Sequence, residues 1–401
     1  MSKDSIKTGD VIEVVTERLA YGGDAVARVG GLAVFIKGAA PRERVRARVI
    51  ERKKNFARAV IDQIIEPSPE RREPPCRYFG DCGGCQLQHL SYGAQLEAKA
   101  GFVRDALSRI GKIDWREEIK VHSASELGYR SRAQIKLEPP RSPERKGKLR
   151  IGFNRAGSHS VCDVESCPVL VPELNSALAR IRTSVKQEAN GGGYGGPLEI
   201  EMAAGDCGLA VSPLLAGFDS AEIKRQVGGH TYSFNATNFF QVNALLLDHF
   251  VAEATGDESG RVALDLYAGV GLFTLPLARR FERVIAVESD TPAAASAQIN
   301  LAENGISNVE FHNERVERWL AGFKDRADFV LLDPPRSGAA EAVNAILELT
   351  PPTIRYVSCD PTTLARDLRR LAEGGYKIAS ITAFDFFPQT YHVEAMVTLK
   401  A

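Results

Sequence analysis

The stretch Tyr356-Val-Ser-Cys-Asp-Pro-Thr-Thr-Leu-Ala-Arg-Asp367 joins a short apolar run to a segment with helical periodicity. Asp360-Pro361 interrupts the run, and leucines then recur at helical spacing between Leu364 and Leu371. The pattern predicts a buried strand that ends near Cys359 and a helix that follows it. Open α/β sheets bind ligands at the carboxyl edge of their strands, so Cys359 is placed to act as a nucleophile. A buried structural cysteine is the alternative that this stretch leaves open.

The overall composition of the chain gives little information about its function. The 401 residues carry 51 basic and 51 acidic side chains, so the net charge indicates no class of partner. The length predicts two or three domains. Because no apolar run could span a bilayer and the sequence starts without a signal-peptide core, we expect a cytoplasmic protein. Three of the seven cysteines crowd together, which favours a metal site or catalysis over disulfide bonds.

Residues 1–66 consist of short β-rich runs separated by glycine turns, which predicts a five-stranded barrel of the oligonucleotide-binding type. Within them, Arg44, Arg46 and Arg48 alternate with apolar residues, so a strand places all three on one face. Positions 37–58 hold nine basic and two acidic residues. This excess predicts a phosphate-binding surface, with a solvated strand face as the alternative.

The segment Cys76-Arg-Tyr-Phe-Gly-Asp-Cys-Gly-Gly-Cys85 places three thiols where they can surround one metal centre. A fourth ligand is needed, and Cys162 and Cys167 are the candidates. Zinc usually takes paired Cys-x2-Cys knuckles. One pair, one outlier and one distant cysteine fit an iron–sulfur cluster at least as well, so the spacing leaves both metals open.

Residues 67–245 have the pattern of a mixed α+β domain, with a helix predicted over 91–111. Positions 130–155 hold a second excess, of nine basic and two acidic residues, with Tyr129 and Phe153 close in sequence. Neutralising the backbone while stacking bases on aromatic rings is how proteins hold single-stranded RNA. We therefore predict a second RNA-binding surface here.

From residue 246 strands and helices alternate. The run from Val262 to Leu277 is an apolar strand, a turn containing Gly269 and Gly271, and a helix start, so a ligand can approach the backbone closely. The next strand ends at Glu288, whose carboxylate can accept hydrogen bonds from both hydroxyls of a ribose. Because the glycines do not follow the dinucleotide pattern, we predict an S-adenosylmethionine site, with an ordinary nucleotide-binding unit as the alternative.

Two further carboxylates are expected near the same sheet edge. Asp333 ends the apolar run that begins at Phe329, so it should point into the same crevice. Glu394 stands in the otherwise apolar final strand, where burial would raise its pKa and suit it to proton transfer. An exposed edge position is the alternative for Glu394.

These motifs together resemble the RNA (uracil-5-)-methyltransferases. The resemblance rests on Asp265-Leu-Tyr-Ala-Gly-Val-Gly271, Leu332-Asp-Pro-Pro-Arg336, Ser358-Cys-Asp-Pro361, His392-Val-Glu-Ala395 and the F-x-Q-x-N stretch Phe239-Phe-Gln-Val-Asn243. The N-terminal barrel is similar to a TRAM domain, and the clustered cysteines resemble the family's 4Fe–4S motif. The likeness covers essentially the whole chain and is greatest to the 23S ribosomal RNA branch, since it has both features.

The resemblance implies a TRAM-like barrel at 1–66, a central RNA-binding domain with the iron–sulfur loop at 67–245, and a Rossmann-like methyltransferase domain at 246–401. It implies that Cys359 is the nucleophile and Glu394 the base. It further implies that S-adenosylmethionine is bound by Gln241, Tyr267, Glu288 and Asp333, and the 4Fe–4S cluster by Cys76, Cys82, Cys85 and Cys167. Cys167 fits better than Cys162 because it precedes Pro-Val-Leu.

The sequence departs from the family pattern at two places. Leu272 stands where relatives carry a polar contact to the cofactor. The polar residue expected after the third strand of the methyltransferase domain is ambiguous among Asn313, Glu314 and Arg315.

The implied chemistry explains these residue types. Uracil C5 is a poor nucleophile, and a thiolate that adds at C6 makes C5 enolate-like; a base must then remove the C5 proton. We expect a monomeric enzyme that methylates C5 of a uridine in RNA, most simply in an unpaired loop of 23S ribosomal RNA. The alternatives are a methyltransferase for an exocyclic amine of nucleic acid or protein, and an RNA-binding protein whose cluster senses redox state.

Overall fold

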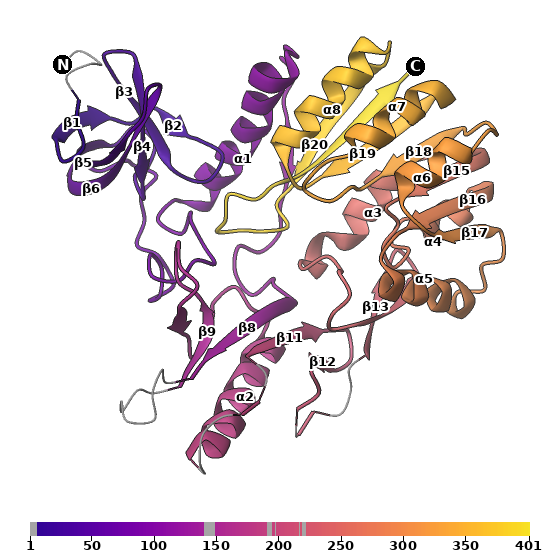
Figure 1. The fold of residues 1–401 in the computed structure, drawn as a ribbon, viewed down its shortest axis with the longest axis horizontal. Helices are drawn as coiled ribbons and strands as arrows, with labels where there is room; N and C mark the ends of the chain where they lie inside the picture. The colour runs from indigo at the N-terminus through magenta and orange to yellow at the C-terminus, as the bar shows by residue number, and fades with distance from the viewer. Residues whose placement is uncertain (1–5, 140–148, 191–194, 197, 216, 219–221) are drawn as a thin grey trace.

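The computed structural model describes residues 6–139, 149–190, 195–196, 198–215, 217–218 and 222–401 (Figure 1). The N-terminal part is a six-stranded sheet in the order β1-β5-β6-β4-β3-β2. Its strands are β1 (Val11–Val15), β2 (Arg18–Leu19), β3 (Ala25–Val29), β4 (Leu32–Lys37), β5 (Arg44–Arg52) and β6 (Phe56–Glu66). The prediction of five strands was wrong by one, because a strand as short as β2 has no periodicity to detect.

Alternation along β5 confirms the predicted face: Val45, Ala47 and Val49 are buried, and the first three arginines are exposed. The buried side chains of this sheet form a core of their own, which extends to Leu87, Leu90 and Phe102 of the following segment. The barrel is therefore anchored to the rest of the chain by packing and not by a free linker.

Helix α1 (Tyr92–Ala106) begins after Ser91, whose side chain accepts a hydrogen bond from the Ala94 N–H, and continues into a π-helical turn (Leu107–Gly111). The predicted helix is thus confirmed. In Figure 1, α1 lies between the barrel and the C-terminal sheet, and it packs against helix α8 (Pro361–Glu373).

The central part is a five-stranded sheet in the order β10-β9-β8-β11-β12, covered by α2 (Pro172–Asn190). Its strands are β8 (Arg132–Glu138), β9 (Arg150–Asn154), β10 (Val161–Asp163), β11 (Glu199–Ala204) and β12 (Leu209–Ser212). A separate hairpin follows, of β13 (Glu222–Val227) and β14 (His230–Asn235). Positions 140–148 of the second basic segment lie outside the described residues.

The C-terminal part is an eight-stranded sheet in the order β17-β16-β15-β18-β19-β21-β20-β7. The first five strands in this order are parallel, β21 is antiparallel to β19 and to β20, and β7 is parallel to β20. The strands are β7 (Lys120–His122), β15 (Gly260–Leu266), β16 (Phe281–Glu288), β17 (Val309–Asn313), β18 (Phe329–Leu332), β19 (Thr353–Ser358), β20 (Lys377–Phe384) and β21 (Glu394–Lys400). This is the predicted Rossmann-like methyltransferase fold.

Helices cover both faces of this sheet, which explains why its central strands are continuously apolar. One face packs against α1, α6 (Val316–Gly322), α7 (Ala340–Leu349) and α8, and the other against α3 (Leu247–Thr255), α4 (Thr274–Ala278) and α5 (Thr291–Glu303). A short 3-10 turn (Ala244–Leu246) precedes α3. In the part of the chain that the structure describes, no helix is long and apolar enough to cross a membrane.

Candidate active site

A cavity of about 670 Å³ opens where the parallel strands of the C-terminal sheet end. Its lining contains every position expected to act in catalysis or cofactor binding: Cys359, Glu394, Gln241, Tyr267, Glu288 and Asp333. The fold therefore brings six residues that are spread from 241 to 394 in the sequence into one crevice.

Two adjacent strands position the thiol and the carboxylate. Strand β19 ends at Ser358, and Asp360 then caps α8 by accepting hydrogen bonds from the N–H groups of Thr362 and Thr363, at 2.8 and 3.3 Å. Cys359 thus lies on the predicted strand-to-helix turn. Glu394 begins β21, an inner strand, and only 3% of it is exposed. The alternative of an exposed edge position for Glu394 is therefore wrong.

Burial controls the protonation of this pair. Burial, Glu394 and Asp333 raise the pKa of Cys359 to about 12, while Arg336 acts in the opposite direction. Burial and Asp333 raise the pKa of Glu394 well above its ordinary value, and Arg336 again opposes the shift. At neutral pH the thiol is thus neutral, burial favours the protonated form of Glu394, and Arg336 opposes both shifts. Sequence reasoning overlooked Arg336, although it is the last residue of the L-D-P-P-R motif.

The glycine turn and the second strand are joined by hydrogen bonds. The Gly269 N–H donates to Glu288 Oε2 at 2.9 Å, and the Asp290 N–H donates to Glu288 Oε1 at 2.6 Å. Gly269 has φ +57°, and a Cβ built on it would meet no atom within 4 Å. A glycine is therefore favoured here by the left-handed backbone conformation, and not because a side chain would clash. Tyr267 adopts φ +64° in the same turn, a conformation rare for a residue with a side chain.

Asp265 lies below this turn and is 1% exposed. Its Oδ2 accepts a hydrogen bond from Thr274 Oγ1 at 2.5 Å, and its Oδ1 has no hydrogen-bond partner among the described residues. Burial raises the pKa of Asp265 to about 7, and the charge of Glu288 adds to this shift.

The remaining candidate positions differ in whether they line the cavity. Gln241 lines the cavity and is 3% exposed, and within the described residues its buried Oε1 lacks a hydrogen-bond partner. Of the three candidates after the third strand, Arg315 lines the cavity. Asn313 instead donates to the Glu288 carbonyl at 2.9 Å, and Glu314 pairs with a neighbouring arginine on α6. Leu272 lines the cavity as an apolar contact.

A second cavity, of about 270 Å³, is lined by four thiols: Cys76, Cys82, Cys85 and Cys167. Burial raises the pKa of Cys85 to about 12, and the charges of the other three thiols add to that shift. Cys162 is not part of the lining, and its Sγ lies 3.4 Å from Asp81 Oδ2, within hydrogen-bond distance. The geometry thus groups Cys167, and not Cys162, with the three clustered cysteines.

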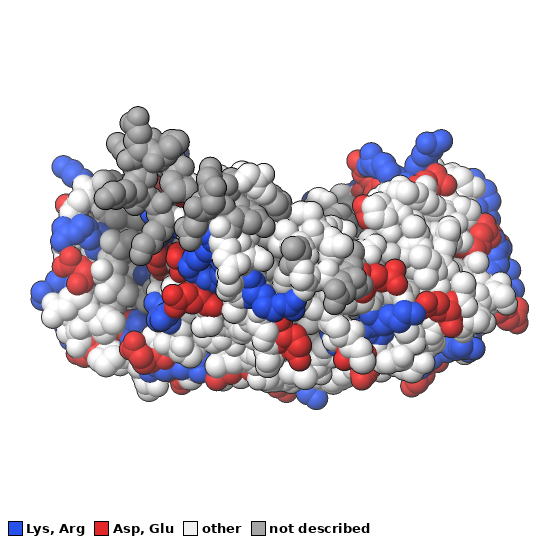
Figure 2. Space-filling view, turned by 90° about the horizontal axis from the view of Figure 1, so that it is seen from below, with Lys and Arg blue, Asp and Glu red and all other residues white. Residues whose placement is uncertain are grey.

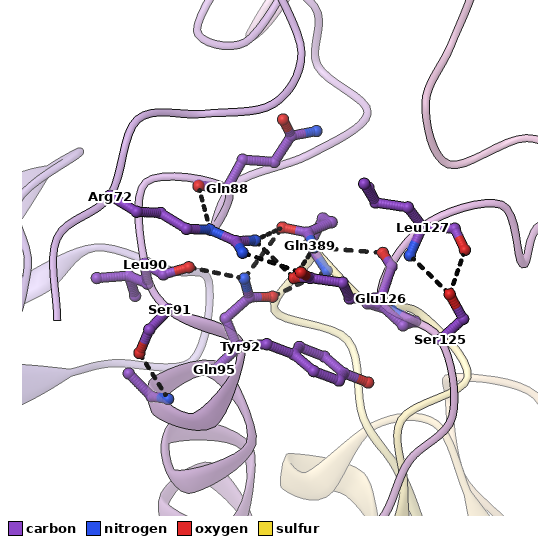
Figure 3. Close-up of polar contacts among 12 residues, drawn as sticks. Arg72, Gln88, Leu90, Ser91, Tyr92, Gln95, Ser125, Glu126, Leu127 and Gln389 are labelled. Carbon is purple, nitrogen blue, oxygen red and sulfur yellow. Dashed lines mark hydrogen bonds and ion pairs between the residues drawn. The ribbon is translucent and has the colours of Figure 1, made fainter.

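The segment 385–393, called here the 385–393 loop, precedes Glu394, and polar contacts of Gln389 join it to the segment that follows the clustered cysteines (Figure 3). The backbone N–H groups of Gln86 and Leu87, directly after the third clustered cysteine, both donate to the Gln389 carbonyl at 2.9 Å. The Gln389 side-chain oxygen accepts hydrogen bonds from Gln95 at 3.0 Å and from Arg72 at 3.2 Å. Gln389 is fully buried and has φ +70°, so this network fixes the path of the loop that leads into Glu394.

A row of aromatic rings runs from the barrel to the catalytic cavity. Tyr21 of the barrel lies 5.3 Å from Tyr391 between ring centroids, and Tyr391 lies 4.3 Å from His392. His392 in turn lies 5.7 Å from Phe387, and both line the catalytic cavity. Burial raises the pKa of Tyr21, and Asp360, Tyr391 and Cys359 add to the shift, which places this barrel residue near Cys359.

The exposed arginine face of the barrel carries acids that the charge count over 37–58 omits. Arg44 pairs with Glu13 at 2.6 Å and with Glu66 at 3.0 Å, and Arg48 pairs with Asp62 at 2.8 Å. The positive potential of this face is therefore smaller than the sequence indicated. Figure 2 shows a similar mixture of charges, since blue and red side chains are interspersed over the described residues on the face drawn there.

The second predicted RNA-binding segment needs a correction. Tyr129 is 1% exposed and its hydroxyl donates to the Pro388 carbonyl at 2.9 Å, so its ring is not available to stack on a base. Phe153 is partly buried and lines the four-thiol cavity. Both rings therefore pack within the protein.

Comparison with known proteins agrees with this geometry. Residues 219–401 match the family model described as tRNA (Uracil-5-)-methyltransferase, and residues 6–61 match the TRAM domain. The 23S rRNA (uracil(1939)-C(5))-methyltransferase RlmD of Salmonella choleraesuis is 35% identical over 100% of this chain and 98% of its own length. The chain belongs to the RNA (uracil-5-)-methyltransferase family. It is thus an enzyme of the class that transfers a methyl group from S-adenosylmethionine to C5 of uridine in RNA.

Other members of the family extend the likeness. An uncharacterized RNA methyltransferase of Aquifex aeolicus is 33% identical over 97% of this chain and 98% of its own. The crystal structure of Pyrococcus abyssi tRNA (uracil-54, C5)-methyltransferase in complex with S-adenosyl-L-homocysteine superposes with a TM-score of 0.74, at 25% identity, over 97% of this chain and 100% of the other. The similarity to family members therefore runs through the barrel, the central part and the methyltransferase fold.

Proposed function

We propose that this uracil methyltransferase acts on 23S ribosomal RNA in the cytoplasm, as a monomer, through a covalent bond between Cys359 and uracil C6. The observation that carries the proposal is the placement of Cys359 and Glu394 side by side in the cavity that also contains the glycine turn. The full-length likeness to a 23S ribosomal RNA enzyme supports the substrate.

Cys359 acts first. In the free cavity its thiol is neutral, so it must lose its proton to solvent before it attacks. Arg336 favours the thiolate, whereas the charge of Glu394 raises the pKa of the thiol and disfavours it. The thiolate adds to C6, the C5=C6 double bond moves into an enolate, and C5 becomes nucleophilic enough to be methylated.

Glu394 acts last. Glu394 first loses its own proton to solvent, and once C5 carries the new methyl group, Glu394 as a carboxylate removes the C5 proton. The electron pair of the broken C–H bond re-forms the C5=C6 double bond and expels the Cys359 thiolate. A carboxylate with a raised pKa is a stronger base than an ordinary one, which suits this step.

The residues of the cavity fit S-adenosylmethionine. Glu288 is held by two backbone N–H groups at the position expected for a ribose, Gln241 offers an unsatisfied oxygen, and Asp333 and Tyr267 complete the lining. When bound, S-adenosylmethionine supplies an electrophilic methyl group.

We further propose that Cys76, Cys82, Cys85 and Cys167 bind a 4Fe–4S cluster. Four partly buried thiols around one cavity fit a cationic centre, since their thiolates would repel one another without it. When bound, such a cluster supplies a rigid cross-link and a redox-sensitive group. Backbone contacts from Gln86 and Leu87 then carry its position to the 385–393 loop.

The division into a barrel at 1–66, a central part at 67–245 and a catalytic part at 246–401 remains a proposal about roles: RNA affinity, RNA positioning and chemistry. The test of the whole proposal is release of tritium from RNA labelled at uridine C5, with 23S ribosomal RNA and transfer RNA as separate substrates. We expect release from 23S RNA. Methylation without release would favour an exocyclic amine as the target, and release from transfer RNA alone would overturn the ribosomal assignment.

A further inference from the structure

A cluster of two histidines and one glutamate lies outside the catalytic cavity, at the end of the C-terminal sheet. His249 and Glu253 are four residues apart on α3, so their side chains project from the same face of the helix. His122 comes from β7, the edge strand. The three candidate ligand atoms all lie within 4.8 Å of one another.

The two distances from the histidines to Glu253 in this cluster are compatible with metal ligands. His122 Nε2 lies 3.3 Å from Glu253 Oε2, and His249 Nε2 lies 3.4 Å from the same oxygen. Both are longer than an ordinary N–H···O hydrogen bond of about 2.9 Å. In a tetrahedral zinc site with bonds of about 2.0 to 2.1 Å, two ligand atoms are separated by about 3.4 Å. An octahedral ion with similar bonds would bring them to about 3.0 Å.

The surroundings hold the ligands in place. Glu253 Oε1 accepts a hydrogen bond from Thr382 Oγ1 at 2.6 Å, which leaves Oε2 for a metal. The His122 ring stacks on Phe384 with 4.8 Å between centroids, and the His122 side chain is only 10% exposed. His249 is half exposed, so a water molecule can reach the fourth coordination position.

We propose that His122, His249 and Glu253 form a zinc site that fastens α3 to the β7–β20 edge of the sheet. Nothing in the methyl-transfer chemistry requires this metal. Its expected role is structural: Phe384 lies opposite Glu394 in the β20–β21 register, so the site supports the strand behind the catalytic base.

The test uses the full chain, purified without oxygen so that its thiols keep their own metal, treated with a chelator, and titrated with Zn²⁺ or Co²⁺. The variants are His249→Gln and Glu253→Gln, of which Glu253→Gln keeps the size of the side chain and a partner for Thr382. The matched control is His312→Gln, since His312 pairs with Glu310 at 2.8 Å without a third ligand.

We expect wild type and the control to bind one further equivalent of Zn²⁺ and to gain thermal stability from it. Both site variants should bind at least tenfold more weakly and gain nothing. Bound Co²⁺ should give the intense visible bands of a tetrahedral site without the near-ultraviolet bands of thiolate ligation. Equal zinc binding and equal stabilisation in His249→Gln and wild type would overturn the proposal. A six-coordinate Co²⁺ spectrum would overturn the assignment to zinc.

Discussion

Cys359 and Glu394 occupy opposite positions across the β19–β21 strand pair. The antiparallel register joins Thr353 to Lys400 and Ser358 to Ala395, and its next step places Cys359 across from Glu394. Opposite residues of antiparallel strands have Cβ atoms about 5 Å apart. The nucleophile and the base of the proposed mechanism therefore lie at the end of one backbone ladder.

The proposed mechanism predicts that substitutions at Cys359 and at Glu394 block different steps of the reaction. Cys359→Ala should bind RNA and S-adenosylmethionine yet methylate nothing, because C5 is never activated. Glu394→Gln should add and methylate but not eliminate, so a protein–RNA adduct that survives denaturing electrophoresis should accumulate. RNA containing 5-fluorouridine should trap the wild type in the same way, with Cys359 in the adduct peptide. Near-normal turnover by Cys359→Ala would exclude covalent catalysis here.

The raised pKa of Cys359 predicts slow alkylation of the free enzyme at neutral pH. Since its pKa is about 12, the thiolate fraction and the rate of reaction with iodoacetamide should keep rising up to strongly basic pH. Arg336→Gln removes the group that opposes this shift and should slow alkylation at pH 8, by about tenfold for each further pKa unit. Peptide mapping follows Cys359 separately from the other thiols. An alkylation rate that levels off near pH 8 would contradict the predicted direction.

Asp265 predicts a pH dependence of stability. Its pKa rises from 3.8 to about 7 on folding, so between these values the folded state binds more protons than the unfolded state. The free energy of unfolding should therefore fall as the pH rises from about 4 to about 7, by at most about 4 kcal/mol from this group. Asp265→Asn should remove that decrease, which urea unfolding at several pH values can measure. The exposed Asp114→Asn is the control, and identical pH profiles for wild type and Asp265→Asn would refute the prediction.

The four-thiol cavity predicts which cysteine holds iron. Cys167→Ser should lose iron and visible absorption, whereas Cys162→Ser should keep both. Because Gln86 and Leu87 donate to Gln389, we expect loss of the metal also to lower kcat through a displaced 385–393 loop, with less effect on binding of S-adenosylmethionine. Iron analysis, absorption spectra and equilibrium binding measure the three effects. Stoichiometric zinc without iron in protein purified anaerobically would rule out the cluster.

The paired arginines of β5 predict a measurable contribution to RNA binding. Replacing Arg44, Arg46 and Arg48 together by Gln should weaken RNA binding and reduce the slope of log K against log salt, by about 0.7 for each phosphate of single-stranded RNA that the variant no longer neutralises. Affinity for S-adenosylmethionine should not change. A double change at the exposed Arg318 and Lys324 is the control. If the triple variant binds RNA at low salt like wild type, the ion pairs with Glu13, Glu66 and Asp62 already occupy these arginines.

The sequence determined the local elements of this protein and the chemistry attached to each. A strand before Cys359, a glycine turn after Asp265 and a strand before Asp333 could be read because apolar runs, glycines and prolines act on neighbouring residues. The alternation that exposes Arg44, Arg46 and Arg48 is local in the same sense.

The tertiary structure decided which residues of these elements contact one another. The strand register set Glu394 opposite Cys359, packing grouped Cys167 with the clustered thiols, and acids from β1 and β6 neutralised the arginines of β5. Tyr129 was buried, although it lies in a basic segment. These outcomes depend on contacts between residues distant in sequence, and the pairing of strands and the packing of side chains that create such contacts leave no signal in a local pattern.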